Sequence, residues 1–176
     1  MDFDKDLAAR QQARELARQA EQAQNRLCEF SQEQLDRIVG AVAAAFSGEA
    51  VTLAEEAVQE TGFGNIRDKT AKNRFASEKV LSAVKDMKTV GVLTRDAQKR
   101  LWEIGVPVGV IAAIVPSTNP TSTVCYKAII ALKAGCAIIF SPHPKAVSCT
   151  RHAAELVARA AEAAGAPKGA VSCLTI

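Results

Sequence analysis

The carboxyl-terminal half of the chain alternates short apolar runs with helix-length stretches, and this pattern limits the fold more than any other feature. Apolar runs occupy residues 108–115, 136–140 and 170–176, and helical patterns fill residues 122–133 and 145–164. The first run is apolar on both faces, as is typical of a buried parallel strand. Strand, helix, strand, helix, strand predicts an α/β fold, the first half of a doubly wound, Rossmann-like parallel sheet with right-handed crossovers.

The amino-terminal half is predicted to be helical. Ser31 and Gln34 have the spacing of a capping box at the start of a second helix. A third helix over about residues 49–60 should stop at Gly62 and Gly64, and Asp68 is expected to cap a fourth helix. The apolar residues that recur at helical spacing are Leu16, Ala20, Ala23, Leu27 and Phe30 in the first helix, Leu35, Ile38, Val39, Val42 and Phe46 in the second, and Phe75, Val80 and Val84 in the fourth.

These patterns divide the chain into three parts. We expect a helical segment over residues 1–88, a β segment over 89–106 with a strand at 99–106, and a partial nucleotide-binding domain over 107–176. The sequence stops inside the last predicted strand, and half of such a sheet leaves an apolar strand edge uncovered. The sequence is therefore expected to be part of a longer protein.

Composition and charge exclude several classes of function. The net charge is +3 with acidic and basic residues interleaved, whereas a nucleic-acid surface needs a clustered basic stripe. The longest apolar run is too short to cross a bilayer, and the acidic start of the chain is no signal peptide. Five cysteines without a CxxC pair indicate neither a disulfide framework nor a metal site, and favour a cytoplasmic protein.

Ligands of open α/β sheets bind beyond the carboxyl ends of the strands. This rule selects the loops at residues 116–121 and 141–144 and the segment after Leu174. No GxGxxG or Walker A motif is present, so the two commonest phosphate loops are absent.

The two loops carry a resemblance to a known family. The segment PVGVIAAIVPSTNPTSTVCYKAIIALKAGCAIIFSPHP is similar to the aldehyde dehydrogenase superfamily, as are AAGAPKGAV and the EFSQEQLDRIV and NRFASEKV helices. Most members have Pro-Trp-Asn-Phe and Lys-Pro-Ser loops. The PSTNPT and SPHP loops of this sequence resemble instead the CoA-acylating branch, including the aldehyde half of bifunctional aldehyde-alcohol dehydrogenases. The likeness covers essentially the whole chain.

The resemblance implies an NAD-dependent reaction that converts a short aldehyde such as acetaldehyde, with coenzyme A, into an acyl-CoA. It also implies that Asn119 donates its side-chain amide to the thiohemiacetal oxyanion. From the residues alone, Asn119 could simply begin a helix, with Pro120 at its first position, and both roles can hold together. The resemblance further implies cofactor contacts, at Ile114, Val115, Pro116 and Ser117 on the nicotinamide side and at Gly165 and Pro167 on the adenine side.

The second loop does not decide which nicotinamide cofactor is used. Ser141 stands where the superfamily has the lysine that holds the adenosine ribose, and Pro142 follows it. His143 could contact the adenosine or be a surface histidine fixed between two prolines. The loss of the lysine leaves the choice between NAD and NADP undecided.

The cysteines do not match the nucleophile of the family, which occurs later in the chain. Cys125 is interpreted as a small buried hydrophobe on a helix, Cys136 and Cys173 as strand residues, and Cys28 and Cys149 as helix residues. We therefore expect this chain to lack the nucleophile and to be inactive alone.

Two surfaces have competing interpretations. Lys69, Lys72 and Arg74, with Glu78 and Lys79, are expected to form a solvated helix face, the alternative being a patch near the CoA phosphates. Trp102 is expected to pack or to contact another subunit, since family members associate through this segment, and a homo-oligomer is expected.

Two alternative functions remain open at this point. One is a short chain that binds a nucleotide or a partner without catalysis, and the other is part of a hydrolytic aldehyde dehydrogenase. The absence of a leading targeting extension favours a free cytoplasmic enzyme over one packaged in a protein shell.

Overall fold

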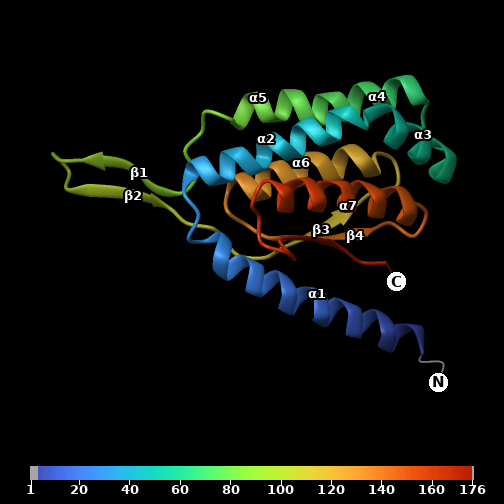
Figure 1. Ribbon diagram of the computed structural model, residues 1–176, viewed down its shortest axis with the longest axis horizontal. Coiled ribbons are helices and arrows are strands. Elements are labelled where there is room, and N and C mark those ends of the chain that lie inside the picture. Colours follow the sequence, from blue (N-terminus) through green and yellow to red (C-terminus); the bar gives the residue numbers. More distant parts are fainter. Residues whose placement is uncertain (1–3, 176) are drawn as a thin grey trace.

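A three-stranded parallel sheet forms the centre of the computed structural model, which describes residues 4–175. Its strands lie side by side in the order β3 (Ile111–Val115), β4 (Ile138–Pro142) and β5 (Val171–Cys173). Helix α6 (Pro120–Lys133) connects the first two strands, and α7 (Val147–Ala163) connects the last two. The predicted half of a doubly wound parallel sheet is confirmed (Figure 1).

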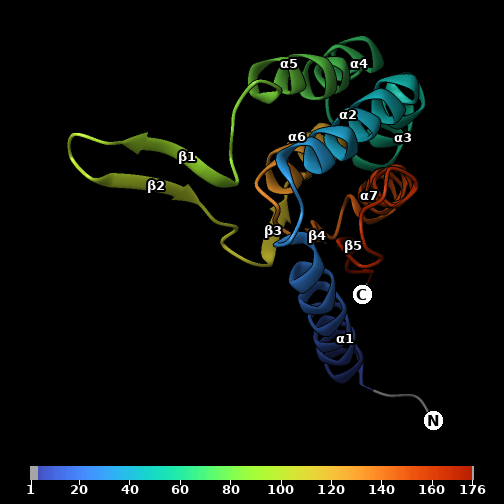
Figure 2. The same cartoon turned by 60° about the vertical axis from the view of Figure 1, so that its left-hand side comes forward.

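Helices cover both faces of this sheet. Helix α1 contacts β4 and β5 from one side, α6 and α7 lie on the other, and α2 packs across α6 and α7 (Figure 2). The helical first half is therefore confirmed. Its elements are α1 (Lys5–Leu27), α2 (Gln32–Gly48), α3 (Ala50–Thr61), α4 (Ile66–Arg74), a π-helical turn η1 (Phe75–Lys79) and α5 (Val80–Val84).

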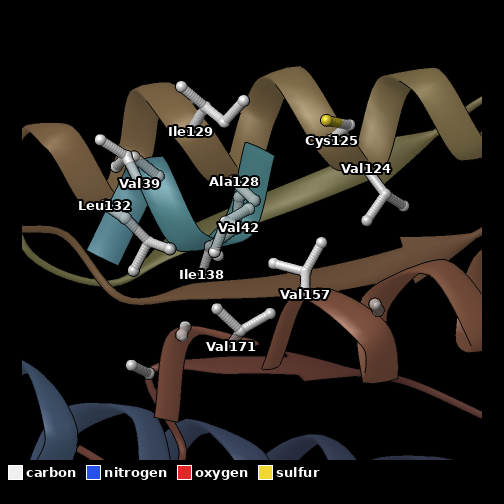
Figure 3. Close-up of a cluster of buried hydrophobic side chains, with 14 of the residues drawn as sticks. Val39, Val42, Val124, Cys125, Ala128, Ile129, Leu132, Ile138, Val157 and Val171 are labelled. Atoms are coloured by element: carbon white, nitrogen blue, oxygen red, sulfur yellow. The ribbon is translucent and has the colours of Figure 1, made fainter. Parts of the chain in front are cut away.

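The main core lies between α2, α6, α7 and the sheet (Figure 3). Leu132 and Ile129 of α6 and Ile138 of β4 are fully buried there. Each such side chain contributes about 2 kcal/mol through the apolar surface that it removes from water. This core holds the crossover helices against the strands and so sets the positions of the loops that follow β3 and β4.

The expectation that residues 108–115 form one strand buried on both faces is wrong. Strand β3 starts at Ile111, and the side chain of Ile114 is 78% exposed although Val115 is buried. The physical reason is that β3 is an edge strand and α1 contacts the other two strands, so one side of β3 stays open to solvent.

The helix starts follow local capping chemistry. The capping box is confirmed, because Ser31 Oγ accepts a hydrogen bond from the Gln34 N–H and Gln34 Oε1 accepts one from the Ser31 N–H. Gly62 ends α3 in the left-handed region, at φ 69°. Asp68 does not cap the fourth helix: Asn65 does, through Oδ1, which accepts from the Asp68 N–H. Asp68 lies in the first helical turn, where its charge suits the helix dipole.

Phe75 does not share the buried face of the fourth helical segment. Its side chain is 63% exposed, whereas Ala76 and Ser77 are buried and Val80 and Val84 pack against the core. The inward side of the π-turn carries small side chains, and η1 contacts α2 and α6 there. Phe75 is consequently turned to the outer side.

A β-hairpin projects from the body at the end of the helical half (Figures 1 and 2). It consists of β1 (Gly91–Asp96) and β2 (Leu101–Gly105), which pair antiparallel. The sequence indicated only the second of these strands. The Arg95 guanidinium lies over the Trp102 ring, 4.2 Å from its centroid, and Trp102 is 57% exposed.

No single helix among residues 4–175 has the length and apolar character to cross a membrane, although α2 and α3 together would reach that length across a 65° bend.

Candidate functional site

The loops that follow β3 and β4 lie side by side at the carboxyl edge of the sheet. Ile114 pairs with Ser141 in the parallel register, and Val115 pairs with Pro142. The His143 N–H then donates to the Val115 carbonyl at 3.1 Å, which joins the two loops. Five of the residues selected from the sequence are thus brought together where ligands of such sheets bind.

Asn119 begins α6, and its side chain is free from the usual capping bond. It is the N-cap residue, with Pro120 at the first helical position, but its side chain makes no bond to the amides of the first turn. Its Oδ1 instead accepts from Lys72 Nζ at 3.1 Å. Because Oδ1 faces the ammonium, the Nδ2 group, which has no hydrogen-bond partner within residues 4–175, remains as a donor.

The predicted solvated face of α4 is wrong for Lys69, although Lys72 is exposed as expected. Lys69 is only 5% exposed, and its Nζ donates to the Thr118 carbonyl at 2.7 Å. Burial, and next the charge of Lys72, lower the pKa of Lys69. Lys72 is exposed but bonded to Asn119. The two ammonium groups therefore hold consecutive residues of the loop before α6.

A buried amide anchors the same helix to α6. Asn73, 1% exposed, donates through Nδ2 to the Ala50 carbonyl at 2.9 Å and accepts through Oδ1 from the Thr121 hydroxyl at 2.9 Å. Sequence reasoning missed this residue together with the role of Lys69 and Lys72. The available signal was their place on one helical face, since Lys72 and Asn73 follow Lys69 by three and four residues.

The remaining residues of the two loops are accessible. Pro116 and His143 are exposed, and Ser117 is half-buried. His143 Nδ1 accepts from the Lys145 N–H at 3.1 Å, so the neutral ring carries its proton on Nε2 and can offer it to a ligand. The apolar end of β3 and the Nε2–H donor of His143 together form a surface that suits a nicotinamide nucleotide.

The amino terminus of α7 is already occupied by a carboxylate. Glu60 of α3 accepts from the Ser148 and Cys149 N–H groups, at 2.8 Å each. Burial would raise the pKa of Glu60, but the bonds from Cys149 and Ser148 outweigh it and lower that pKa. These two amides are satisfied within the chain, so they are not available to a phosphate in the way that helix amino termini often are.

Gly165 and Pro167 are not part of this cluster. They precede β5, and in a parallel sheet the segment before a strand lies at the amino edge. Asn119 and His143 follow β3 and β4 and lie at the carboxyl edge. The structure separates the two sets by the length of the strands.

The thiols described near the sheet are not activated. Burial raises the pKa of Cys125 far above its usual range; burial and then the Glu60 carboxylate raise that of Cys149 to about 12. Burial raises the pKa of Cys173 to about 12 as well. The interpretation of Cys125 as a buried hydrophobe is confirmed.

The other cysteines depart slightly from their expected places. Cys136 lies two residues before β4 instead of within it, and Cys28 follows the last residue of α1 and is exposed. Within residues 4–175 no three His, Cys, Asp or Glu side chains come close enough to hold a metal ion.

The comparisons with known proteins agree on one family. The model of the aldehyde dehydrogenase family matches residues 4–176. The bifunctional aldehyde-alcohol dehydrogenase AdhE of Escherichia coli (strain K12) is 48% identical over 153 residues, which are 87% of this chain and 17% of that protein.

Solved structures show the same likeness. An acetylating aldehyde dehydrogenase from Geobacillus thermoglucosidasius superposes with a TM-score of 0.97 at 52% identity, over 99% of this chain and 38% of that one. A propionaldehyde dehydrogenase from Rhodopseudomonas palustris with bound propionyl-CoA gives 0.75 at 30% identity, over 91% and 35%. The chain thus spans less than two fifths of each of these proteins.

Proposed function

The chain belongs to the aldehyde dehydrogenase family, and on this premise we propose that it supplies the amino-terminal part of an NAD-dependent, CoA-acylating aldehyde dehydrogenase. The proposed reaction converts an aldehyde, coenzyme A and NAD into an acyl-CoA and NADH. A short aldehyde such as acetaldehyde is the proposed substrate. The support is the likeness over nearly the whole chain to enzymes named as acetylating.

One observation carries the proposal: the Asn119 amide at the carboxyl edge, with Oδ1 bonded to Lys72 and Nδ2 free to donate. When a thiolate attacks an aldehyde carbonyl, the carbonyl oxygen becomes an oxyanion that needs a preorganised donor. A neutral amide supplies this donor without a pKa of its own to tune. The nucleophilic cysteine is proposed to lie outside these residues, so that the chain alone is inactive.

The cofactor is proposed to lie across the ends of β3 and β4. Ile114, Val115, Pro116 and Ser117 would line its nicotinamide side, and the segment from Ser141 to His143 its adenosine side. When bound, the nicotinamide would supply the hydride acceptor for the oxidation. Gly165 and Pro167 are left out of this proposal because they lie at the other edge of the sheet.

The assembly is proposed to be a cytoplasmic homo-oligomer that associates through residues 89–106. Its support is the exposed apolar surface of the hairpin, which includes Leu101, Trp102 and Ile104, each at least 50% exposed. All five cysteines are free, which suits a reducing compartment.

The proposal is tested with the gene product that contains these residues, purified from its source. We expect NADH and acyl-CoA to form from acetaldehyde only when coenzyme A is added, and NADP to be the poorer oxidant. Formation of the free acid without coenzyme A would indicate the hydrolytic alternative instead. A product of only 18.7 kDa that binds nucleotide without turnover would indicate the non-catalytic one.

The role of Asn119 is tested in the same enzyme. Asn119→Ala should lower kcat roughly a hundredfold or more, the usual effect of removing one oxyanion donor. Asn25→Ala, at an exposed position of α1, is the matched control and should keep the wild-type rate. A wild-type rate for Asn119→Ala would remove the oxyanion assignment.

A further inference from the structure

One face of α4 reaches the loop that carries Asn119. Lys72 and Asn73 follow Lys69 by three and four residues, so each lies beside Lys69 on the same side of the helix. Their polar atoms bond respectively to the Thr118 carbonyl, the Asn119 side chain and the Thr121 hydroxyl. The loop is therefore fixed from outside by a helix that precedes it by about fifty residues.

The contact from Lys72 decides how the Asn119 amide is oriented. An ammonium group carries only donors, so it binds the amide oxygen and would repel the amide NH2 group. The N-cap position normally offers a second partner for the oxygen, the amides of the first helical turn, but Asn119 makes no such bond. Lys72 is thus the one partner of this side chain within residues 4–175.

The contact from Lys69 fixes the backbone beside it. A buried ammonium is costly unless it meets an acceptor, and the Thr118 carbonyl at 2.7 Å is its acceptor. The bond between Asn73 and Thr121, both buried, holds the first turn of α6 on the other side of Asn119. The position of the Asn119 backbone is therefore set by these groups, and the rotation of its side chain by Lys72.

We propose that Lys72 is a positioning residue that turns the Asn119 amide so that Nδ2 points at the developing oxyanion. This inference rests on the proposed function. A nearby positive charge also polarises the amide and strengthens Nδ2 as a donor, because hydrogen bonds in a chain reinforce one another. The alternative, that Lys72 binds a phosphate of coenzyme A, predicts a different kinetic effect.

The test uses the complete enzyme and the variants Lys72→Met, Lys72→Arg and Asn119→Ala. Lys72→Met keeps the length of the side chain without its charge and should lower kcat roughly tenfold, less than the loss of the donor itself. The KM for coenzyme A should stay within about twofold of wild type, and Lys72→Arg should recover most of the rate. Lys79→Met removes another exposed lysine of the same helical segment and should have no effect.

A double variant separates positioning from a general electrostatic effect. If Lys72 acts through Asn119, then Lys72→Met should not slow the Asn119→Ala enzyme further. A crystal structure of the Lys72→Met enzyme should show the amide rotated or in two orientations. The thermal midpoint should be unchanged, since an exposed lysine contributes little to stability.

Three results would overturn the inference. They are a wild-type kcat for Lys72→Met, a raised KM for coenzyme A at unchanged kcat, and a full additional loss in the Asn119→Ala background. If Asn119→Ala is slow and Lys72→Met is not, only the positioning role is refuted. If Asn119→Ala is itself fast, the oxyanion assignment fails and the positioning role fails with it.

Discussion

The buried amide of Asn73 provides a quantitative test of how α4 is held against α6. Asn73→Ala removes the partner of the Thr121 hydroxyl and one of the two donors to the Ala50 carbonyl, which also accepts from the Ala54 N–H within α3. Ala50 and Thr121 are at most 2% exposed. A buried polar group without a partner costs about 1–3 kcal/mol. The loss of one further hydrogen bond, at the Ala50 carbonyl, costs about 0.5–1.5 kcal/mol, so the two changes together should lower the free energy of opening of this region by about 1.5–4.5 kcal/mol.

Amide hydrogen exchange measures this free energy locally, which matters in a long protein whose overall unfolding is not two-state. The protection of the α4 amides and of the first turns of α6 should fall roughly 10- to 1,500-fold, since 1.4 kcal/mol corresponds to a factor of ten. The amides of α1 should be unaffected. Asn25→Ala, with its exposed side chain, is the matched control.

Thr121→Val completes the cycle, because it keeps the shape of the side chain and removes only the hydroxyl. It leaves Asn73 Oδ1 unpaired and should cost about 1–3 kcal/mol on its own. In the Asn73→Ala background the same change should cost little, since the shared bond is already lost. The reasoning is refuted if Asn73→Ala changes the α4 protection less than threefold, or if Thr121→Val costs as much in both backgrounds.

Two further predictions concern the start of α7. Glu60→Gln should lower the stability of α7 by about 0.5–1 kcal/mol at neutral pH, because the partly exposed carboxylate caps two amides. Since the pKa of Glu60 is lowered in the folded state, the difference in stability should be complete above the ordinary pKa of glutamate and should disappear as the pH falls through the folded-state pKa. A difference in stability that persists in acid would contradict this prediction. At pH 8 an alkylating reagent should label Cys28 well before Cys149, because Cys28 is exposed whereas burial raises the pKa of Cys149 to about 12. Peptide mapping by mass spectrometry measures the two rates. Rapid labelling of Cys149 in the native protein would contradict its burial.

The sequence alone determined the elements whose signals are local. The capping box at Ser31 and the glycine stop at Gly62 depend on neighbouring residues only, and both were found in the structure. The parallel half-sheet followed from the order of apolar runs and helices, because parallel strands require a crossover helix between them. The place of Asn119 at the carboxyl edge follows from that topology and from its position in the loop that follows β3.

Predictions from the sequence were wrong where the exposure of a side chain depends on which other segment packs against it. Ile114 belongs to a continuous apolar run, yet it is exposed because β3 is an edge strand in the described residues. Phe75 has an apolar side chain on a helical segment, but the side facing α2 and α6 holds Ala76 and Ser77. Neither outcome can be read from the residues themselves, since each depends on which neighbours pack there.

The surroundings of Asn119 were decided by tertiary structure in the same way. Its identity and its position in the chain are features of the sequence, and the family resemblance at that position implied an oxyanion donor. Lys69 and Lys72 are charged residues of the kind that form a solvated helix face. The packing of α4 against α6 buries Lys69 and brings Lys72 to the Asn119 amide. A local pattern fixes which atoms a residue can offer, but the partner that orients those atoms lies about fifty residues away and is chosen by the packing of the helices.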